Sequence, residues 1–186
     1  MPGLKVAARQ LVRRFEAQAA NQQVAGLAAA AWVAKVAPDL VPGDDLQRLK
    51  RDTLALQTDE GWFVEYGGPD LGYLAVTMDC LWDLYDATGD EDYITSASRA
   101  MRFIQPFTQL PSRGAGMHNA RNTDYIVPYG IARFLAHGGQ DAQIASSILQ
   151  RAWGTLASPD HFAHAIDDRY WCHYIGHSLI RSIPLL

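Results

Sequence analysis

Apolar residues recur at three- and four-residue steps along most of this chain. In residues 71–85 the pattern includes Leu74, Met78 and Leu81, and it returns in residues 94–104. Side chains at this spacing share one face of an α-helix, so both segments are predicted to be amphipathic helices. Because no clear two-residue alternation is found, we expect few strands and predict an all-α fold.

The predicted helices come in pairs joined by turns. Gly89 lies in one turn, where glycine suits the left-handed conformation that ends a helix, and Gly138 and Gly139 lie in another. The pairs start about 50 residues apart, which is typical of proteins built from repeated helix hairpins. We therefore expect a single domain over residues 1–186. The predicted pairs are residues 24–36 with 45–57, residues 71–87 with 92–103, and residues 124–136 with 142–156.

Composition and charge indicate which kinds of binding partner to expect. The chain has 186 residues, a net charge of −4 and no basic tract, so we expect no nucleic-acid partner. No apolar run is long enough to span a membrane, and residues 3–19 carry charges where an export signal would be apolar. Cys80 and Cys172 are far apart and form no disulfide framework, which is compatible with a reducing compartment. We therefore expect a cytoplasmic protein without a membrane partner.

Two connections between the pairs are unusually long. They comprise residues 57–70 and residues 106–121, whereas connections between helices are normally shorter. Long ordered loops often carry function. If the pairs stack side by side, both loops emerge at the same end of the stack, and we expect them to form one concave binding face.

These loops resemble those of α/α-toroid proteins. Gln57-Thr-Asp-Glu-Gly-Trp-Phe63 and Glu65-Tyr-Gly-Gly-Pro-Asp-Leu-Gly-Tyr73 look like loops of heparinase-like toroids, and Arg121-Asn-Thr-Asp-Tyr125 looks like a second such segment. Heparinase and alginate-lyase types of polysaccharide lyase, unsaturated-glucuronyl hydrolases and terpenoid cyclases share this architecture. The resemblance covers roughly residues 20 to 180 and implies an incomplete toroid, about half to two thirds of a six-hairpin ring. The chain would then be part of a longer protein or a reduced toroid that needs a partner.

The resemblance implies a carbohydrate-active domain, lyase-like or glycosidase-like, that acts on or binds an acidic sugar polymer. A non-catalytic module that binds a ligand or another protein through the same face is the alternative. A terpenoid-cyclase-like domain is a second alternative, because Gln57-x-x-x-Gly61-Trp62 is similar to the repeat motif that ties helix ends together in squalene-type cyclases. The Asp-x-Asp-Asp acid motif of those enzymes is missing from the sequence.

The second long connection holds the candidate catalytic residues. A lyase must neutralise the carboxylate of a uronic acid, remove a proton with a base and protonate the leaving oxygen with an acid. Asn or Arg can do the first, and Tyr or His the other two. The simpler interpretation is that an asparagine caps the next helix and the arginine is a surface charge. The candidates are His118, Arg121, Asn122 and Tyr125.

The first long connection holds the candidate sugar-binding residues. Aromatic rings with nearby carboxylates suit sugars, which offer apolar C–H faces and hydroxyl edges. The alternative is that these residues only pack the loop against the helix ends. The candidates are Trp62, Glu65, Tyr66, Asp70 and Tyr73.

Two further groups of residues have the spacing of metal ligands, but we favour a structural role for both. His173 and His177 are four residues apart, as metal ligands on a helix can be, but a third ligand cannot be named and helix packing is more typical. Four aspartates at helical spacing could hold magnesium, although a solvated outer face is far more common. We therefore predict no metal site and no cofactor. The four aspartates are Asp79, Asp83, Asp86 and Asp90.

An incomplete ring should leave one flank of apolar side chains uncovered. Uncovered apolar patches usually meet a partner. We therefore expect a homodimer or a complex with another chain, formed through the C-terminal helix around residues 170–183.

Overall fold

The computed structural model describes residues 2–109, 125–153 and 175–186, and in these ranges helices are the regular secondary structure of the chain. The predicted fold class is therefore confirmed, and no strand occurs in the described ranges. Two isolated bridges pair residues of the 57–70 loop with each other, and a third pairs Ala19 with Glu65. The helices are α1 (Pro2–Arg13), α2 (Ala20–Val36), α3 (Gly43–Leu54), α4 (Leu71–Thr88), α5 (Asp92–Ile104), α6 (Tyr129–His137), α7 (Gly139–Trp153) and α9 (Gly176–Ser182), with short 3-10 turns at Pro38–Leu40, Phe107–Gln109 and Ile183–Leu185.

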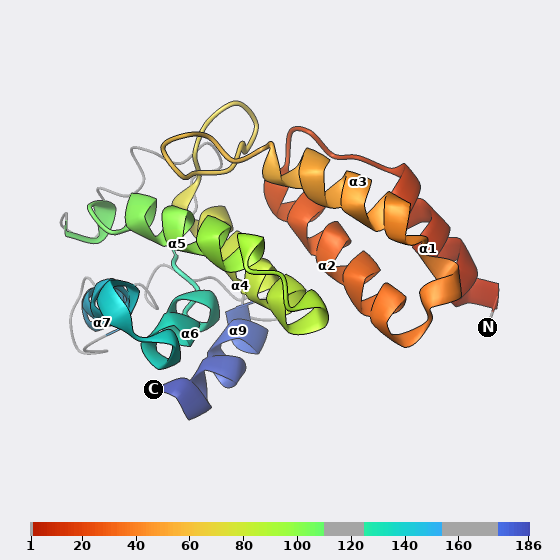
Figure 1. Ribbon diagram of the computed structural model, residues 1–186. Helices are drawn as coiled ribbons and strands as arrows, with labels where there is room; N and C mark the ends of the chain where they lie inside the picture. Colours follow the sequence, from red (N-terminus) through yellow and green to blue (C-terminus); the bar gives the residue numbers. More distant parts are fainter. Residues whose placement is uncertain (1, 110–124, 154–174) are drawn as a thin grey trace.

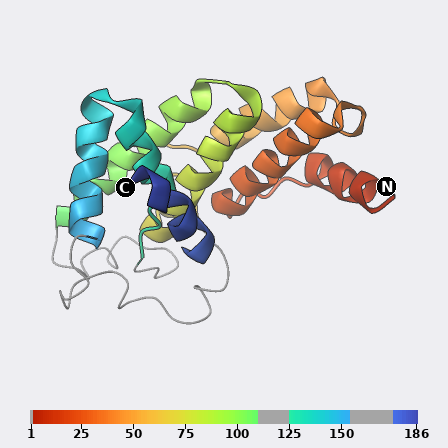
Figure 2. The same cartoon turned by 90° about the horizontal axis from the view of Figure 1, so that it is seen from below.

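The helices form a row of hairpins. The first helices of the three pairs, α2, α4 and α6, are neighbours in that order. Helix α9 packs on α6 and also reaches α4 through an ion pair between Arg181 and Asp83. The second helix of each pair packs on its own first helix, and α1 packs against α2 and α3. Figure 1 and Figure 2 show α1 to α3 at one end of the row and α6, α7 and α9 at the other. The described helices thus make an open row, and closure into a toroid stays a prediction.

The row is held together by one continuous hydrophobic core. Helix α4 supplies its centre, with Leu74, Met78, Leu81 and Trp82 all buried, because α4 is covered by α2, α5 and α6 at once. Such burial on several sides explains why α4 is apolar around most of its circumference rather than along a single stripe. None of the helices in the described ranges is long and apolar enough to cross a lipid bilayer.

Helices α4 and α6 cross in unusually close contact at Gly130. A Cβ atom on this glycine would lie 2.7 Å from the backbone of both Met78 and Asp79, so only glycine fits. The Gly130 N–H donates to Asp79 Oδ1 at 2.6 Å, and its carbonyl accepts a hydrogen bond from Trp82 Nε1 at 2.7 Å. The crossing is therefore fixed by sterics and by two buried hydrogen bonds.

The start of the third hairpin differs from the sequence prediction. Helix α6 begins at Tyr129, whereas residues 125–127 are buried without helical structure. The reason is Pro128, because proline disfavours helical geometry in the residue before it. The predicted start at residue 124 lies outside the described residues.

The prediction of a solvated outer face for the four aspartates is wrong for Asp79, which is buried, whereas Asp86 is exposed and Asp83 and Asp90 are partly exposed. Asp79 is 8% exposed, and each of the other three forms an ion pair with a basic residue from another helix. Arg181 of α9 pairs with Asp83, Arg133 of α6 with Asp86, and Lys50 of α3 with Asp90. The three ion-paired aspartates therefore connect α4, and the turn that follows it, to α3, α6 and α9.

The two arginines in this network also lie over aromatic rings. The guanidinium of Arg181 is 3.6 Å from the centre of the Tyr129 ring, and that of Arg133 is 4.4 Å from the centre of the Trp82 ring. Cation–π contacts of this kind add to the ion pairs. The first contact fastens α9 to α6, and the second fastens α6 to α4.

Candidate functional site

The loop of residues 57–70 is a compact structure built by its own hydrogen bonds. The side-chain amide of Gln57 donates to the carbonyls of Gly61 and Ser96, at 2.8 and 2.9 Å, and its oxygen accepts from the Ser96 hydroxyl at 2.8 Å. Gly61 has a φ of 105°, and a Cβ atom there would lie 2.5 Å from the carbonyl oxygen of Arg99. Gln57 and Gly61 thus tie the loop to α5 and have a structural role.

Glu65 fastens the same loop to the start of α2. Its Oε1 accepts a hydrogen bond from the Asn21 N–H at 2.6 Å, and the backbone of Val64 accepts from Ala20 N–H at 3.1 Å. A carboxylate at a helix N-terminus satisfies a free N–H group and faces the positive end of the helix dipole. Glu65 is buried, so the structure gives this predicted sugar ligand a helix-capping contact.

Asp70 caps α4 in the same way. Its Oδ1 accepts from the Tyr73 N–H at 2.9 Å, and Asp70 is buried at the N-cap position. The Tyr73 side chain is half-buried, and the Tyr66 side chain is exposed at a residue with a positive φ of 51°. The five predicted sugar-binding residues therefore do not all line one hollow.

Trp62 does line a hollow of about 560 Å³ at the open end of the α4–α5 hairpin, where α4 begins and α5 ends. The Trp62 ring centre lies 6.5 Å from that of Phe103, which in turn lies 5.2 Å from that of Phe107. Phe103 is on α5 and Phe107 on the turn that follows it, so the aromatic wall combines two segments distant in sequence. The full lining is Glu60, Trp62, Pro69, Arg102, Phe103, Pro106 and Phe107.

Two charged groups lie at the edge of this Trp62 hollow. Glu60 accepts a hydrogen bond from Trp62 Nε1 at 2.7 Å, which orients the indole ring. Arg102 pairs with Asp141 of α7, and Ser98 donates to the same carboxylate at 2.6 Å. The hollow thus offers an aromatic surface, the Glu60 carboxylate as a hydrogen-bond acceptor, and the Arg102 guanidinium, which Asp141 and Ser98 hold in place. Sequence reasoning identified Trp62 but missed Arg102, Phe103 and Phe107, because only the contact between α5 and the loop brings them together.

Of the four predicted catalytic residues, only Tyr125 lies within the described part of the chain. Tyr125 is 2% exposed and belongs to the hydrophobic core, so its ring is packed among the helices. His118, Arg121 and Asn122 lie outside the described residues, as do Cys172 and His173. His177 is exposed on α9. In the described ranges, no three of the His, Cys, Asp and Glu side chains are grouped as a metal site would require.

Comparison with protein-family models, curated proteins and solved structures finds no match for this chain. The likeness of its loops to toroid enzymes therefore stays a prediction. What the chain can bind has to be inferred from its own hollows and surfaces.

Proposed function

We propose that this protein binds an acidic sugar polymer at the Trp62 hollow. The observation that carries the proposal is the aromatic wall of Trp62, Phe103 and Phe107 beside the charged groups of Glu60 and Arg102. Aromatic faces pack against the C–H faces of sugar rings, and carboxylates and guanidinium groups bind hydroxyls and acidic substituents.

The guanidinium favours an acidic sugar over a neutral one. The Asp141 and Ser98 contacts orient Arg102, and an oriented guanidinium can bind a carboxylate or sulfate through two N–H groups. Glu60 is engaged with the indole N–H and can accept a hydrogen bond from a sugar hydroxyl. The open shape of the hollow suits a polymer that crosses the surface.

Replacing Trp62 with alanine should weaken binding of acidic oligosaccharides by about tenfold or more, because a buried aromatic face contributes on the order of 1 kcal/mol or more to such contacts. Calorimetric titration with oligomers of galacturonate, mannuronate and sulfated uronates would measure this. Trp62→Phe keeps a ring and should lose less. Arg102→Gln should weaken acidic oligomers while leaving neutral glucose oligomers unchanged.

Trp32 supplies the matched control for this experiment. Its side chain is 40% exposed, it lies on α2, and the Lys35 ammonium lies over its ring. Trp32→Ala should leave sugar binding unchanged. If Trp62→Ala and Trp32→Ala bind every oligomer like the original protein, the Trp62 hollow is not the sugar site.

A lyase or glycosidase activity at this face is the further part of the proposal, with His118, Arg121 and Asn122 as its candidate residues. Elimination from a uronate creates a conjugated product that absorbs ultraviolet light, so the oligomers used for binding can be assayed directly. The burial of Tyr125 makes it the least favoured acid–base group. His118→Ala would separate catalysis, which it should abolish, from binding at Trp62, which it should spare.

The apolar surface of the C-terminal segment favours a second candidate function, binding to another protein chain or to a second copy of this one. Ile180 and Ile183 are 69% and 65% exposed, and Leu186 is also exposed. On the same helix, Arg181 turns inward to Asp83, so α9 is anchored by its polar side and presents its apolar side.

Replacing Ile180 with aspartate should therefore abolish self-association without destabilising the fold, since the side chain makes little contact within the chain. Analytical ultracentrifugation over micromolar concentrations would show the original protein as a dimer and the variant as a monomer. Val36, also exposed but on α2, provides the control: Val36→Asp should still dimerise. A monomer at all concentrations for the original protein would contradict self-association.

A further inference from the structure

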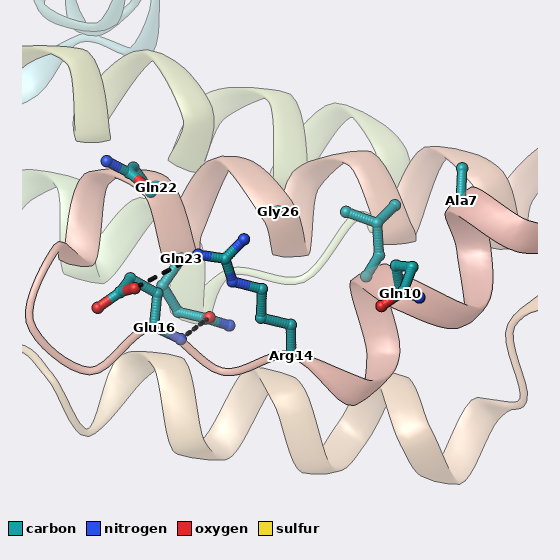
Figure 3. Close-up of a pocket in the computed structure, with 8 residues that line it drawn as sticks. Ala7, Gln10, Arg14, Glu16, Gln22, Gln23 and Gly26 are labelled. Atoms are coloured by element: carbon teal, nitrogen blue, oxygen red, sulfur yellow. Dashed lines mark hydrogen bonds and ion pairs between the residues drawn. The ribbon is translucent and has the colours of Figure 1, made fainter.

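A second hollow, of about 420 Å³, lies between α1 and α2, away from the Trp62 hollow (Figure 3). Its apolar floor is formed by Ala7 and Leu11 of α1 and by Gly26 of α2. A Cβ atom on Gly26 would meet only the Leu11 side chain, at 3.9 Å. The missing side chain at Gly26 therefore leaves the floor open. Around it lie polar residues, namely Gln10, Arg14, Glu16, Gln22 and Gln23.

Gln23, at the edge of this α1–α2 hollow, holds the neighbouring backbone in place by hydrogen bonds. Only 5% of this residue is exposed; its oxygen accepts from the Glu16 N–H at 2.8 Å, and its amide donates to the Thr53 hydroxyl at 3.0 Å. These bonds hold the link between α1 and α2 in place. The same hydrogen bonds fix the backbone of Glu16, whose carboxylate lies at the edge of the hollow.

Charges of both signs lie side by side on this rim. Arg14 Nη2 is 3.8 Å from Glu16 Oε2, a separation that allows attraction but exceeds hydrogen-bond length. The Arg14 side chain is 76% exposed, and Figure 3 shows its guanidinium lying between Glu16 and Gly26. A ligand head group can therefore approach a donor and an acceptor at once, next to an apolar floor.

We propose that the α1–α2 hollow binds a small zwitterion with an aliphatic side chain, such as a free aliphatic amino acid. Its carboxylate pairs with Arg14, its ammonium pairs with Glu16, and its side chain lies on Leu11 and Gly26. A simple anion would face the Glu16 carboxylate, and a simple cation would face the Arg14 guanidinium. Only a ligand carrying both charges gains from both groups. The side-chain amides of Gln10 and Gln22 add hydrogen-bonding groups to the rim, and the volume is in the range of small-molecule sites.

The test uses three probes that share an aliphatic chain and differ in which charged groups they carry. Titration of the full chain with L-leucine, followed by calorimetry or by NMR shifts of α1 and α2 resonances, should show saturable binding. Isocaproate lacks the ammonium group and isoamylamine lacks the carboxylate, so each should bind at least about tenfold more weakly. Absence of saturable leucine binding up to about 10 mM overturns the proposal. Equal binding of isocaproate or isoamylamine overturns the assignment to a zwitterion.

Two variants locate the binding. Gly26→Leu fills the floor and should abolish leucine binding, and Arg14→Gln should weaken it by about tenfold. Arg9→Gln removes the same charge from an exposed position of α1 outside the hollow and should change nothing. Circular dichroism reports whether each variant keeps its helices. Undiminished leucine binding by folded Gly26→Leu would place the site elsewhere and overturn the proposal.

Discussion

Replacing Gly130 with alanine should destabilise the protein by about 3 kcal/mol or more. The new Cβ atom would lie 2.7 Å from backbone atoms of α4, and backbone, unlike a flexible side chain, cannot move aside cheaply. Separating α6 from α4 would also weaken the buried hydrogen bonds from Gly130 to Asp79 and from Trp82 to Gly130. Urea denaturation followed by circular dichroism would measure the loss.

Gly43 provides the matched control for this variant. It begins α3, and a Cβ atom there would meet nothing within 4 Å. Gly43→Ala should therefore leave the free energy of unfolding unchanged or slightly increased, since alanine favours helix. If Gly130→Ala proved as stable as Gly43→Ala, the close crossing of α4 and α6 would be wrong.

The stability of the protein should fall as the pH rises from 4 to 8, and Asp79 should be the main cause. Burial raises the pKa of Asp79 from 3.8 to about 7, although hydrogen bonds from Ser178 and the Gly130 N–H and the charge of Arg181 act in the opposite direction. A carboxyl whose pKa is raised by folding stabilises the folded state below pH 3.8, and this contribution is lost as the pH rises through about 7. A shift of this size corresponds to about 4 kcal/mol.

Asp79→Asn should remove most of that pH dependence, because asparagine keeps an oxygen for the Gly130 N–H and does not ionise. Urea unfolding at several pH values between 4 and 8 would compare the slopes of the variant and the original protein. Asp39→Asn makes the same charge change at an exposed position and should keep the original slope. An unchanged slope in Asp79→Asn would show that another group titrates in this range.

The helices themselves could be predicted from local sequence. The apolar spacing placed α4 and α5 to within one residue at each end, and Gly89 adopts the predicted left-handed conformation, with a φ of 73°. Helix period and glycine conformation depend on a residue and its near neighbours. The error at the start of α6 has a local cause too, since Pro128 limits the residue before it.

The partners of the charged residues could not be predicted in this way. Asp83 and Asp86 have the spacing of a solvated helix face, yet their partners Arg181 and Arg133 lie 98 and 47 residues further along the chain. Glu65 and Asp70 look like sugar ligands beside Trp62, but both accept hydrogen bonds from the N-termini of helices. The role of a carboxylate therefore depends on which hydrogen-bond donor or cation the packing of the chain places next to it.

By itself, the sequence determined that the chain is helical and, to within one residue, where the α4–α5 hairpin begins and ends. It also pointed to Trp62 in the loop of residues 57–70. Tertiary structure alone decided that Phe103, Phe107 and Arg102 join Trp62 there, and that Gly26 leaves a hollow against Leu11. The physical reason is the distance along the chain over which the interactions act. Helix formation is set within a few residues, whereas a hollow is formed by side chains from different helices, and their meeting depends on how the whole row packs.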